Sequence, residues 1–399
     1  MNVDHTSEEL IEILKKVLEV NEIKKDIPLH EPEFCQIESD TLSDCINSNF
    51  VSTSGEYIEK FEFELKKITG AKNVVSVVNG TSALELALRS IGIKRSEEVF
   101  IPALTFVATA NAIKYCDAIP HFVDSDVNTL GIDLLKLENY IGNNCQFKNG
   151  NLYNKKTDRI ISAIMPVHVF GMSIDMEKIL NFGKKYNLFV IEDAAEALGS
   201  LWREQHLGTF GDVGTLSFNG NKIITSGGGG ALLTNNDSLA KKIKHISSTA
   251  KIPHQWDYIH DEVGWNYRMP NLNAALGYAQ LKKFKNILYK KKLLANKYKL
   301  HFQNSKNFSF IDQPKNCESN RWLNCIKIYS KDLSFRNTLL KNLNDFGFRC
   351  RPVWKLLNKL PMYKDCPHSD LSNSIKLEKA IISLPSSAFH IKLNLDTKL

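Results

Sequence analysis

The sequence predicts an α/β protein with a large domain built on a mostly parallel sheet and a smaller α+β domain near its C-terminal end. Short apolar runs alternate with helical patterns over residues 74–235. Runs that are apolar on both faces are typical of parallel strands covered by helices. After about residue 284 the pattern changes to a long basic helix followed by mixed strands and helices. A chain of 399 residues is also too long for one simple core.

These patterns divide the chain into an N-terminal helical extension (1–27), a large domain (28–284) and a small C-terminal domain (285–399). The extension has the spacing of an amphipathic helix, and Thr6 or Ser7 can cap its start. Its expected apolar face consists of Leu10, Ile11, Ile13, Leu14, Val17 and Leu18.

The apolar runs of the large domain predict its strands. In chain order they are residues 74–78, 98–102, 120–124, 161–169, 188–193, 213–218 and 230–234. Residues 145–157 are polar and predict a loop or hairpin. Ligands of parallel sheets bind at the carboxyl ends of the strands. Asn79, Asp193 and the segment 219–222, which directly follow apolar runs, are therefore site candidates.

Composition excludes several classes of protein. The chain is 43% hydrophobic and 24% charged, as in ordinary globular proteins, and no apolar run is long enough to cross a bilayer. We expect no signal peptide, because the first residues lack a basic start and an apolar block. Eight scattered cysteines form no C-x-x-C pair, which indicates reduced thiols, a cytoplasmic protein and no metal site.

The net charge of +7 is explained mainly by a solvated, lysine-rich surface. Attraction of an anionic substrate is the second, less favoured explanation. Nucleic-acid binding is not expected, because the lysines are spread along the chain. The one dense cluster, "KKFKNILYKKKLLANKYK", has an apolar helical side formed by Phe284, Ile287, Leu288, Leu293 and Leu294.

Lys222 follows an apolar run and precedes four glycines, in "TLSFNGNKIITSGGGGALLTN" (215–235). A lysine is nucleophilic only when its amine is neutral, so a catalytic lysine needs desolvation or a positive neighbour. The glycines are not a phosphate P-loop, because no Gly-Lys-Ser/Thr follows them. They form either a simple tight turn or a place where a flat ligand approaches the backbone. By itself, the position of Lys222 does not distinguish a catalytic lysine from an ordinary surface lysine.

Asp193 ends the apolar run "LFVIED". An Asp in this position either caps a helix or is a buried carboxylate that needs a cationic partner. A protonated pyridine nitrogen would be such a partner.

A glycine and two hydroxyl residues, Gly80, Thr81 and Ser82, begin the helical pattern after Asn79. The free N–H groups of a helix start bind phosphate, although Thr81 or Ser82 could instead cap the helix.

Two further residues are site candidates that also have an ordinary structural explanation. Phe106 is either a core aromatic or a platform for a flat ring. Ser217 is either a phosphate ligand or a common polar strand residue. Pyridoxal 5′-phosphate satisfies all these features at once, through its aldehyde, ring nitrogen, flat ring and phosphate.

The chain resembles the DegT/StrS family of pyridoxal-phosphate-dependent nucleotide-sugar aminotransferases. The segments that carry the resemblance run in the family's order over residues 28–285 and include "VNGTSALELAL", "IPALTFVATANAI", "IEDAAEALGS", "GDVGTLSFNGNKIITSGGGGALLT" and "WNYRMPNLNAALGYAQL". The resemblance implies the fold-type-I architecture of aspartate aminotransferase. It also implies that Lys222 is the Schiff-base lysine.

The resemblance implies roles for the other candidates. Asp193 keeps the pyridine nitrogen protonated, and Phe106 stacks on the ring. The phosphate is bound by Gly80, Thr81 and Ser217. Asn266, in "WNYRM", reaches the phosphate from the other subunit of a homodimer, and Arg268 faces the sugar nucleotide. Glu196 takes the place of a family His or Gln near the phenolic oxygen of the cofactor.

The implied activity is transfer of an amino group from glutamate to C4 of a nucleotide-linked 4-keto-6-deoxy sugar. "IPLHEPEF", "NRWLNCIKI" and "RPVWKLLNKLPMYKDCP" resemble the branch that serves legionaminic-acid-type pathways, whose sugars carry a 2-acetamido group. A different sugar, such as a perosamine-like one, is the main alternative.

Two other functions are disfavoured. A sugar dehydratase of this fold would have histidine in place of Lys222. A cofactor-binding DNA regulator would need a larger N-terminal module than one helix.

Overall fold

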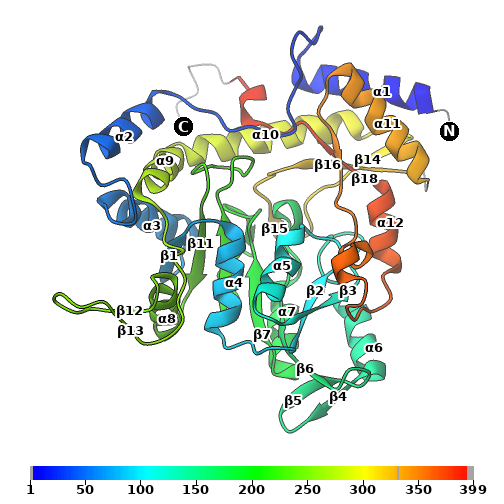
Figure 1. Ribbon diagram of the computed structural model, residues 1–399. Coiled ribbons are helices and arrows are strands. Elements are labelled where there is room, and N and C mark those ends of the chain that lie inside the picture. Colours follow the sequence, from blue (N-terminus) through cyan, green and yellow to red (C-terminus); the bar gives the residue numbers. More distant parts are fainter. Residues whose placement is uncertain (1–2, 330–331, 393–399) are drawn as a thin grey trace.

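The computed structural model describes residues 3–329 and 332–392 (Figure 1). Within these residues the main sheet has nine strands, and seven of them follow one another in the order β1-β11-β10-β7-β6-β2-β3. They are β1 (Asn73–Val77), β11 (Gly230–Thr234), β10 (Val213–Ser217), β7 (Phe189–Asp193), β6 (Arg159–Ile164), β2 (Glu98–Pro102) and β3 (Ile119–Val123). β11 is antiparallel to β1 and β10, and the other neighbouring strands pair in parallel. The predicted α/β class with a mostly parallel sheet is confirmed.

Most strands lie within one or two residues of their predicted positions, and one is shorter than predicted. The regular strand of the run 161–169 ends at Ile164, shortly before Pro166, which has no N–H group for the strand ladder, and Val167 then forms an isolated bridge with Asp193. The polar segment 145–157 is a hairpin of β4 (Cys145–Lys148) and β5 (Asn151–Asn154). β5 pairs with β6, so the hairpin extends the main sheet.

Helices cover the main sheet and join its strands (Figure 1). They are α3 (Glu56–Thr69), α4 (Gly80–Ser90), α5 (Val107–Tyr115), α6 (Leu134–Asn144), α7 (Met176–Tyr186), α8 (Asp237–Ser247) and α9 (Asn271–Lys282). α2 (Gln36–Asn47) packs on α9. A hairpin of β12 (Lys251–Ile252) and β13 (Ile259–His260) projects from the body of the protein in Figure 1.

A second core lies beyond α10 (Phe284–Phe302), the predicted basic helix. Its sheet has the order β14-β16-β18-β17, with β14 (Phe308–Phe310), β16 (Asn324–Ile328), β18 (Ile381–Leu384) and β17 (Arg351–Pro352). α11 (Leu333–Phe346) and α12 (Ser372–Ala380) complete this part of the fold. A separate small sheet joins β15 (Cys317–Glu318), β8 (Leu201–Trp202) and β9 (Gln205–His206). The domain boundaries at residues 27 and 284 stay a prediction.

The N-terminal helix α1 (Val3–Leu18) packs into this second core against α10 and α11. The buried residues of its predicted apolar face are Leu10, Leu14, Val17 and Leu18, whereas Ile11 and Ile13 are half-buried at the edge of the core. The predicted cap was wrong. The helix begins at Val3, and the Ser7 hydroxyl donates to the Val3 carbonyl from inside the helix.

No helix among the residues described is both long enough and apolar enough to span a bilayer. The eight cysteines, all within these residues, are free thiols.

We expect Leu14→Ala to lower the free energy of unfolding by about 2–5 kcal/mol, because it removes a fully buried side chain and leaves a cavity. Urea unfolding followed by tryptophan fluorescence measures this change. Lys16→Ala, at an exposed position of the same helix, is the matched control and should have almost no effect. Equal effects of the two substitutions would show that α1 adds nothing specific to the second core.

Candidate active site

The predicted site residues come from strands whose ends meet at one edge of the main sheet. Asp193 ends β7, and Ser217 ends the adjacent strand β10. Gly230 at the start of β11 pairs with both Ser217 and Val77, because β11 runs in the opposite direction. The edge therefore brings together the end of β7, the end of β10 and the turn that follows β1.

Lys222 lies in the turn that leaves β10, where its N–H donates to the Asn219 carbonyl. Its side chain is only 13% exposed, which excludes an ordinary surface lysine. The Nζ atom lies 3.3 Å from Glu196 Oε1 and 4.2 Å from the centre of the Trp322 ring. A mostly buried amine thus has a carboxylate on one side and an aromatic face on another.

The last two of the four glycines after Lys222 are required by close packing. A Cβ on Gly230 would lie 2.5 Å from the Asn79 carbonyl carbon, and one on Gly229 would lie 2.2 Å from Ser226 Oγ. The backbone of this segment therefore passes directly against the start of α4. The prediction that bulk is excluded here agrees with the packing, although the neighbour that excludes it is protein backbone.

Asp193 is a buried carboxylate that accepts two hydrogen bonds. Thr109 Oγ1 donates to Oδ2 at 2.7 Å, and the Ala195 N–H donates to Oδ1 at 3.2 Å. Turns follow Asp193, so the alternative that it caps a helix is excluded. Burial raises the pKa of Asp193, and the Thr109 hydroxyl, the Ala195 N–H and the Lys222 charge oppose this shift. Among the residues that the structure describes, the Asp193 carboxylate forms no ion pair.

Glu196 is the second buried carboxylate of the site. Its Oε1 faces Lys222, and its Oε2 accepts a hydrogen bond of 2.8 Å from the Phe170 N–H. Burial raises the pKa of Glu196, an effect that the Lys222 charge opposes. The residue that departs from the family pattern is therefore in direct contact with the lysine.

The start of α4 forms a cradle for a small anion. Asn79 caps this helix by accepting from the Ser82 N–H at 2.7 Å, so neither Thr81 nor Ser82 is the cap. The N–H groups of Gly80 and Thr81 belong to the first turn, which has no intrahelical acceptors. A Cβ on Gly80 would lie 2.8 Å from Ser217 Cβ, so the two residues are in close contact.

The remaining candidates lie at the surface. The Phe106 ring is 53% exposed just before α5, which excludes a core aromatic. Arg268 and Asn266 are also exposed. The backbone of Arg268 forms an isolated bridge with Val77 at the end of β1, and Asn266 forms one with Ser248. Arg268 is thus close to the strand-end edge, whereas the Asn266 side chain is open to a neighbouring molecule.

Sequence reasoning missed Thr109, Trp322 and Asn320. Trp322 contacts Lys222, and Asn320 donates to the carbonyl of Glu196. The only signal for the latter two was the motif "NRWLNCIKI", which had no assigned role.

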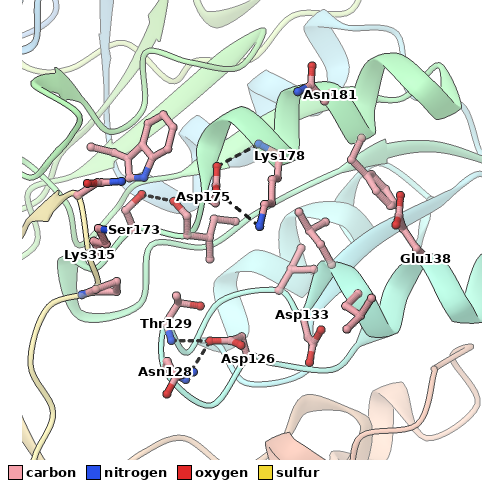
Figure 2. Close-up of a pocket in the computed structure, with 18 of the residues that line it drawn as sticks. Asp126, Asn128, Thr129, Asp133, Glu138, Ser173, Asp175, Lys178, Asn181 and Lys315 are labelled. Carbon is pink, nitrogen blue, oxygen red and sulfur yellow. Dashed lines mark hydrogen bonds and ion pairs between the residues drawn. The ribbon is translucent and has the colours of Figure 1, made fainter.

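Figure 2 shows a cavity of about 790 Å³ elsewhere in the protein, between α6 and α7. Lys178 and Asp175 lie in it with an Nζ–Oδ2 distance of 3.8 Å, and Asp126 accepts backbone N–H groups of Asn128 and Thr129. Lys222, Asp193, Glu196 and Gly80 do not line this cavity. The candidate active site is therefore defined by the strand ends.

Comparisons with known proteins agree with the geometry. Residues 34–393 match the DegT/DnrJ/EryC1/StrS aminotransferase family, and the chain belongs to this family. It is 36% identical to a GDP-perosamine synthase from Escherichia coli O157:H7, over 86% of this chain and 88% of the relative. It is 32% identical to a UDP-4-amino-4,6-dideoxy-N-acetyl-β-L-altrosamine transaminase from Campylobacter jejuni, over 90% and 91%.

The solved structure of Helicobacter pylori PseC, described as an aminotransferase involved in pseudoaminic acid biosynthesis, has a TM-score of 0.83 to this chain. The two chains are 26% identical, and the match covers 94% of this chain and 96% of PseC. The fold-type-I architecture is confirmed, and the protein is a pyridoxal-phosphate-dependent aminotransferase. The site fits this cofactor, since it offers an amine, a buried carboxylate without a close cation, and a helix start where only glycine fits. The roles of the individual residues stay predictions.

We expect Asp193→Asn to stabilise the cofactor-free protein at neutral pH. The pKa of Asp193 is raised above 3.8 by folding, so its favourable contribution exists below that pH and is lost as pH rises. Asn cannot ionise, and it can donate to Thr109 Oγ1, which also lies 3.1 Å from Thr105 Oγ1. Melting temperatures measured at several pH values above 3.8 should therefore diverge in favour of the variant as pH rises.

The same substitution should weaken cofactor binding by at least about tenfold, because the carboxylate partner of the ring nitrogen is lost. Equilibrium titration of the cofactor-free variant checks this result. A variant with unchanged cofactor affinity would contradict the assigned role of Asp193.

Proposed function

We propose that this enzyme transfers an amino group from glutamate to C4 of a nucleotide-linked 4-keto-6-deoxy-2-acetamido sugar, for synthesis of a legionaminic-acid-type surface sugar. The observation that carries the proposal is the Lys222 amine, whose side chain is only 13% exposed and which lies beside Glu196 at the edge that also holds Asp193 and Gly80. Membership of the aminotransferase family supports the reaction class. The N-acetyl sugar in the name of the Campylobacter relative supports the 2-acetamido substrate.

Pyridoxal phosphate, when bound, supplies an aldehyde that takes up the amino group and a ring that withdraws electrons. Lys222 supplies the amine that binds this aldehyde and later moves the proton of the donor amino acid. Its side chain is only 13% exposed, so the amine is held inside the site where the cofactor and the donor meet. Glu196, 3.3 Å away, can hold that amine in place when it is not bound to the cofactor.

Asp193 stabilises positive charge on the ring nitrogen. Its hydrogen bonds from Thr109 and Ala195 fix the carboxylate before the cofactor arrives, so no reorganisation is needed during the reaction. Gly80, Thr81 and Ser217 bind the phosphate at the positive end of α4. The exposed ring of Phe106 is available for stacking.

A perosamine-like substrate, which lacks the 2-acetamido group, is the second candidate. The identity to the Escherichia coli GDP-perosamine synthase favours it. Both candidates share the 4-keto-6-deoxy group and a nucleotide diphosphate, whose negative charge suits the exposed Arg268.

A substrate comparison separates the two candidates. The cofactor-loaded enzyme is given glutamate, and release of 2-oxoglutarate is measured. A UDP-linked 2-acetamido-4-keto-6-deoxy sugar or a GDP-linked 4-keto-6-deoxy sugar is then added, and the amino sugar is identified by mass spectrometry. We expect kcat/KM at least about tenfold higher for the 2-acetamido sugar. The reverse preference would establish the perosamine-like function, and no 2-oxoglutarate release would refute glutamate as donor.

We further propose that the working unit is a homodimer with shared active sites. Exposed large apolar side chains support it, notably Trp256 and Tyr258 on the projecting hairpin and Val263 just after it, which are 70–81% exposed. Phe50 and Phe63, near α2 and α3, are also exposed. Asn266 lies just beyond the hairpin and is free to reach the phosphate of a neighbouring subunit.

Mixed subunits test this arrangement. Lys222→Ala should lower turnover by at least about 10³-fold, and Asn266→Ala should weaken cofactor binding. A hybrid dimer contains one Lys222→Ala subunit and one Asn266→Ala subunit. One of its two sites then has Lys222 from the Asn266→Ala subunit and Asn266 from the Lys222→Ala subunit, so this site is intact. Adding the inactive Lys222→Ala protein, after subunit exchange, should therefore raise the activity per Asn266→Ala subunit. No increase would mean that Asn266 acts within its own chain.

The control for loss of a lysine is Lys178→Ala, because Lys178 lies in the cavity of Figure 2. This variant should stay active.

A further inference from the structure

One short segment, residues 319–324, contacts both loops that carry the charged groups of the site. Asn320 Nδ2 donates to the carbonyl of Glu196 at 2.8 Å and to that of Leu198 at 2.9 Å. The Asn320 N–H donates to Ser200 Oγ at 2.9 Å. The loop that presents Glu196 is therefore held by a residue 124 positions further along the chain.

Trp322 holds the other loop. Its indole Nε1–H donates to the carbonyl of Asn221 at 2.7 Å, directly before Lys222. The same ring lies under the lysine, with Nζ 4.2 Å from its centre, and Trp322 is only 4% exposed. The Trp322 N–H also donates to Asn320 Oδ1 at 2.9 Å, so the two residues are linked.

Lys291 of α10 fixes Trp322 from behind. This lysine is fully buried, and its Nζ donates to the carbonyl of Trp322 at 2.7 Å and to that of Ser386. A buried lysine with two carbonyl partners is costly to retain unless it orders the backbone around it. The backbone of Trp322 is thus held by α10 and linked to Ser386, outside the main sheet.

We propose that Trp322 is a positioning residue for Lys222: its ring supports the free amine and its N–H fixes the turn that carries it. The proposal rests on the proposed function of Lys222. An ammonium over an indole face is attracted by the ring, and Glu196 lies within hydrogen-bonding distance of the same nitrogen. The two contacts hold a long, flexible side chain in one place whenever it is not bound to the cofactor. The lysine side chain is then already close to the conformation in which it acts on the reacting atoms.

The test uses two variants and a matched control in the full-length protein. Trp322→Phe keeps an aromatic ring but removes the N–H donor, and Trp322→Leu removes both. Trp202→Phe is the control, because Trp202 is equally buried and also has a cation over its ring, that of Arg203, but it lies in the sheet of β15, β8 and β9. Circular dichroism and melting temperature establish that each variant is folded.

The first readout is independent of turnover. The cofactor-free proteins are treated at neutral pH with an amine-acylating reagent, and labelling of Lys222 is measured by mass spectrometry. Loss of the aromatic face should raise the labelling rate in Trp322→Leu by roughly threefold or more, because the ammonium is no longer stabilised. Trp322→Phe should change less, and Trp202→Phe not at all. Equal labelling of Trp322→Leu and the wild type would overturn the proposal.

The second readout is steady-state kinetics. Trp322→Phe should lower kcat by roughly tenfold with little change in KM, because the lysine is displaced while the sugar site is intact. If Trp322→Leu does not fold, Trp322→Phe still tests the proposal. A wild-type kcat in Trp322→Phe would refute the role of the indole N–H. If the wild-type protein has no turnover that depends on Lys222, the proposed function fails. The labelling experiment still reports separately on the contact of Trp322 with Lys222.

Discussion

The site depends on the balance of charge around one buried ammonium group. Lys222 is held beside Glu196, while Asp193 is buried with only a hydroxyl and an N–H as donors. Burial raises the pKa of both carboxyl groups. The site thus combines two carboxyl groups, Asp193 and Glu196, with one amine, that of Lys222. In the proposed mechanism, a protonated pyridine ring supplies the positive charge that Asp193 faces.

This arrangement needs support from both parts of the fold. The main sheet brings the strand ends together, because β11 returns antiparallel between β1 and β10 and presses its glycines against the start of α4. The second part of the chain contributes Asn320 and Trp322, which hold the loops of Glu196 and Lys222. Lys291 connects these contacts to α10. The loops that carry the charged groups are thus held by hydrogen bonds to their backbone carbonyls.

The N-terminal extension contributes to the same support. α1 buries its apolar face in the second core, and the chain then crosses toward the site. The Leu29 carbonyl accepts from the Ser386 N–H, and the Glu31 N–H donates to Ser387 Oγ. Ser386 is also the residue whose carbonyl accepts from Lys291. Leu29 and Glu31, which directly follow the extension and precede the residues that match the family, therefore contact the segment behind Trp322.

The sequence by itself determined the α/β class, the approximate strands and the candidates Lys222, Asp193 and Gly80, because these signals are local: an apolar run, a following polar residue, a glycine at a helix start. It left open whether Asp193 capped a helix and whether Lys222 was a surface residue. Only the tertiary structure decided these points, since burial depends on which segments pack together. Thr109, 84 residues from Asp193, and Trp322, 101 residues from Asn221, lie in motifs that the sequence shows, but nothing local indicated which residues they contact. Their roles arise from contacts between distant segments, and no periodicity within a segment records such contacts.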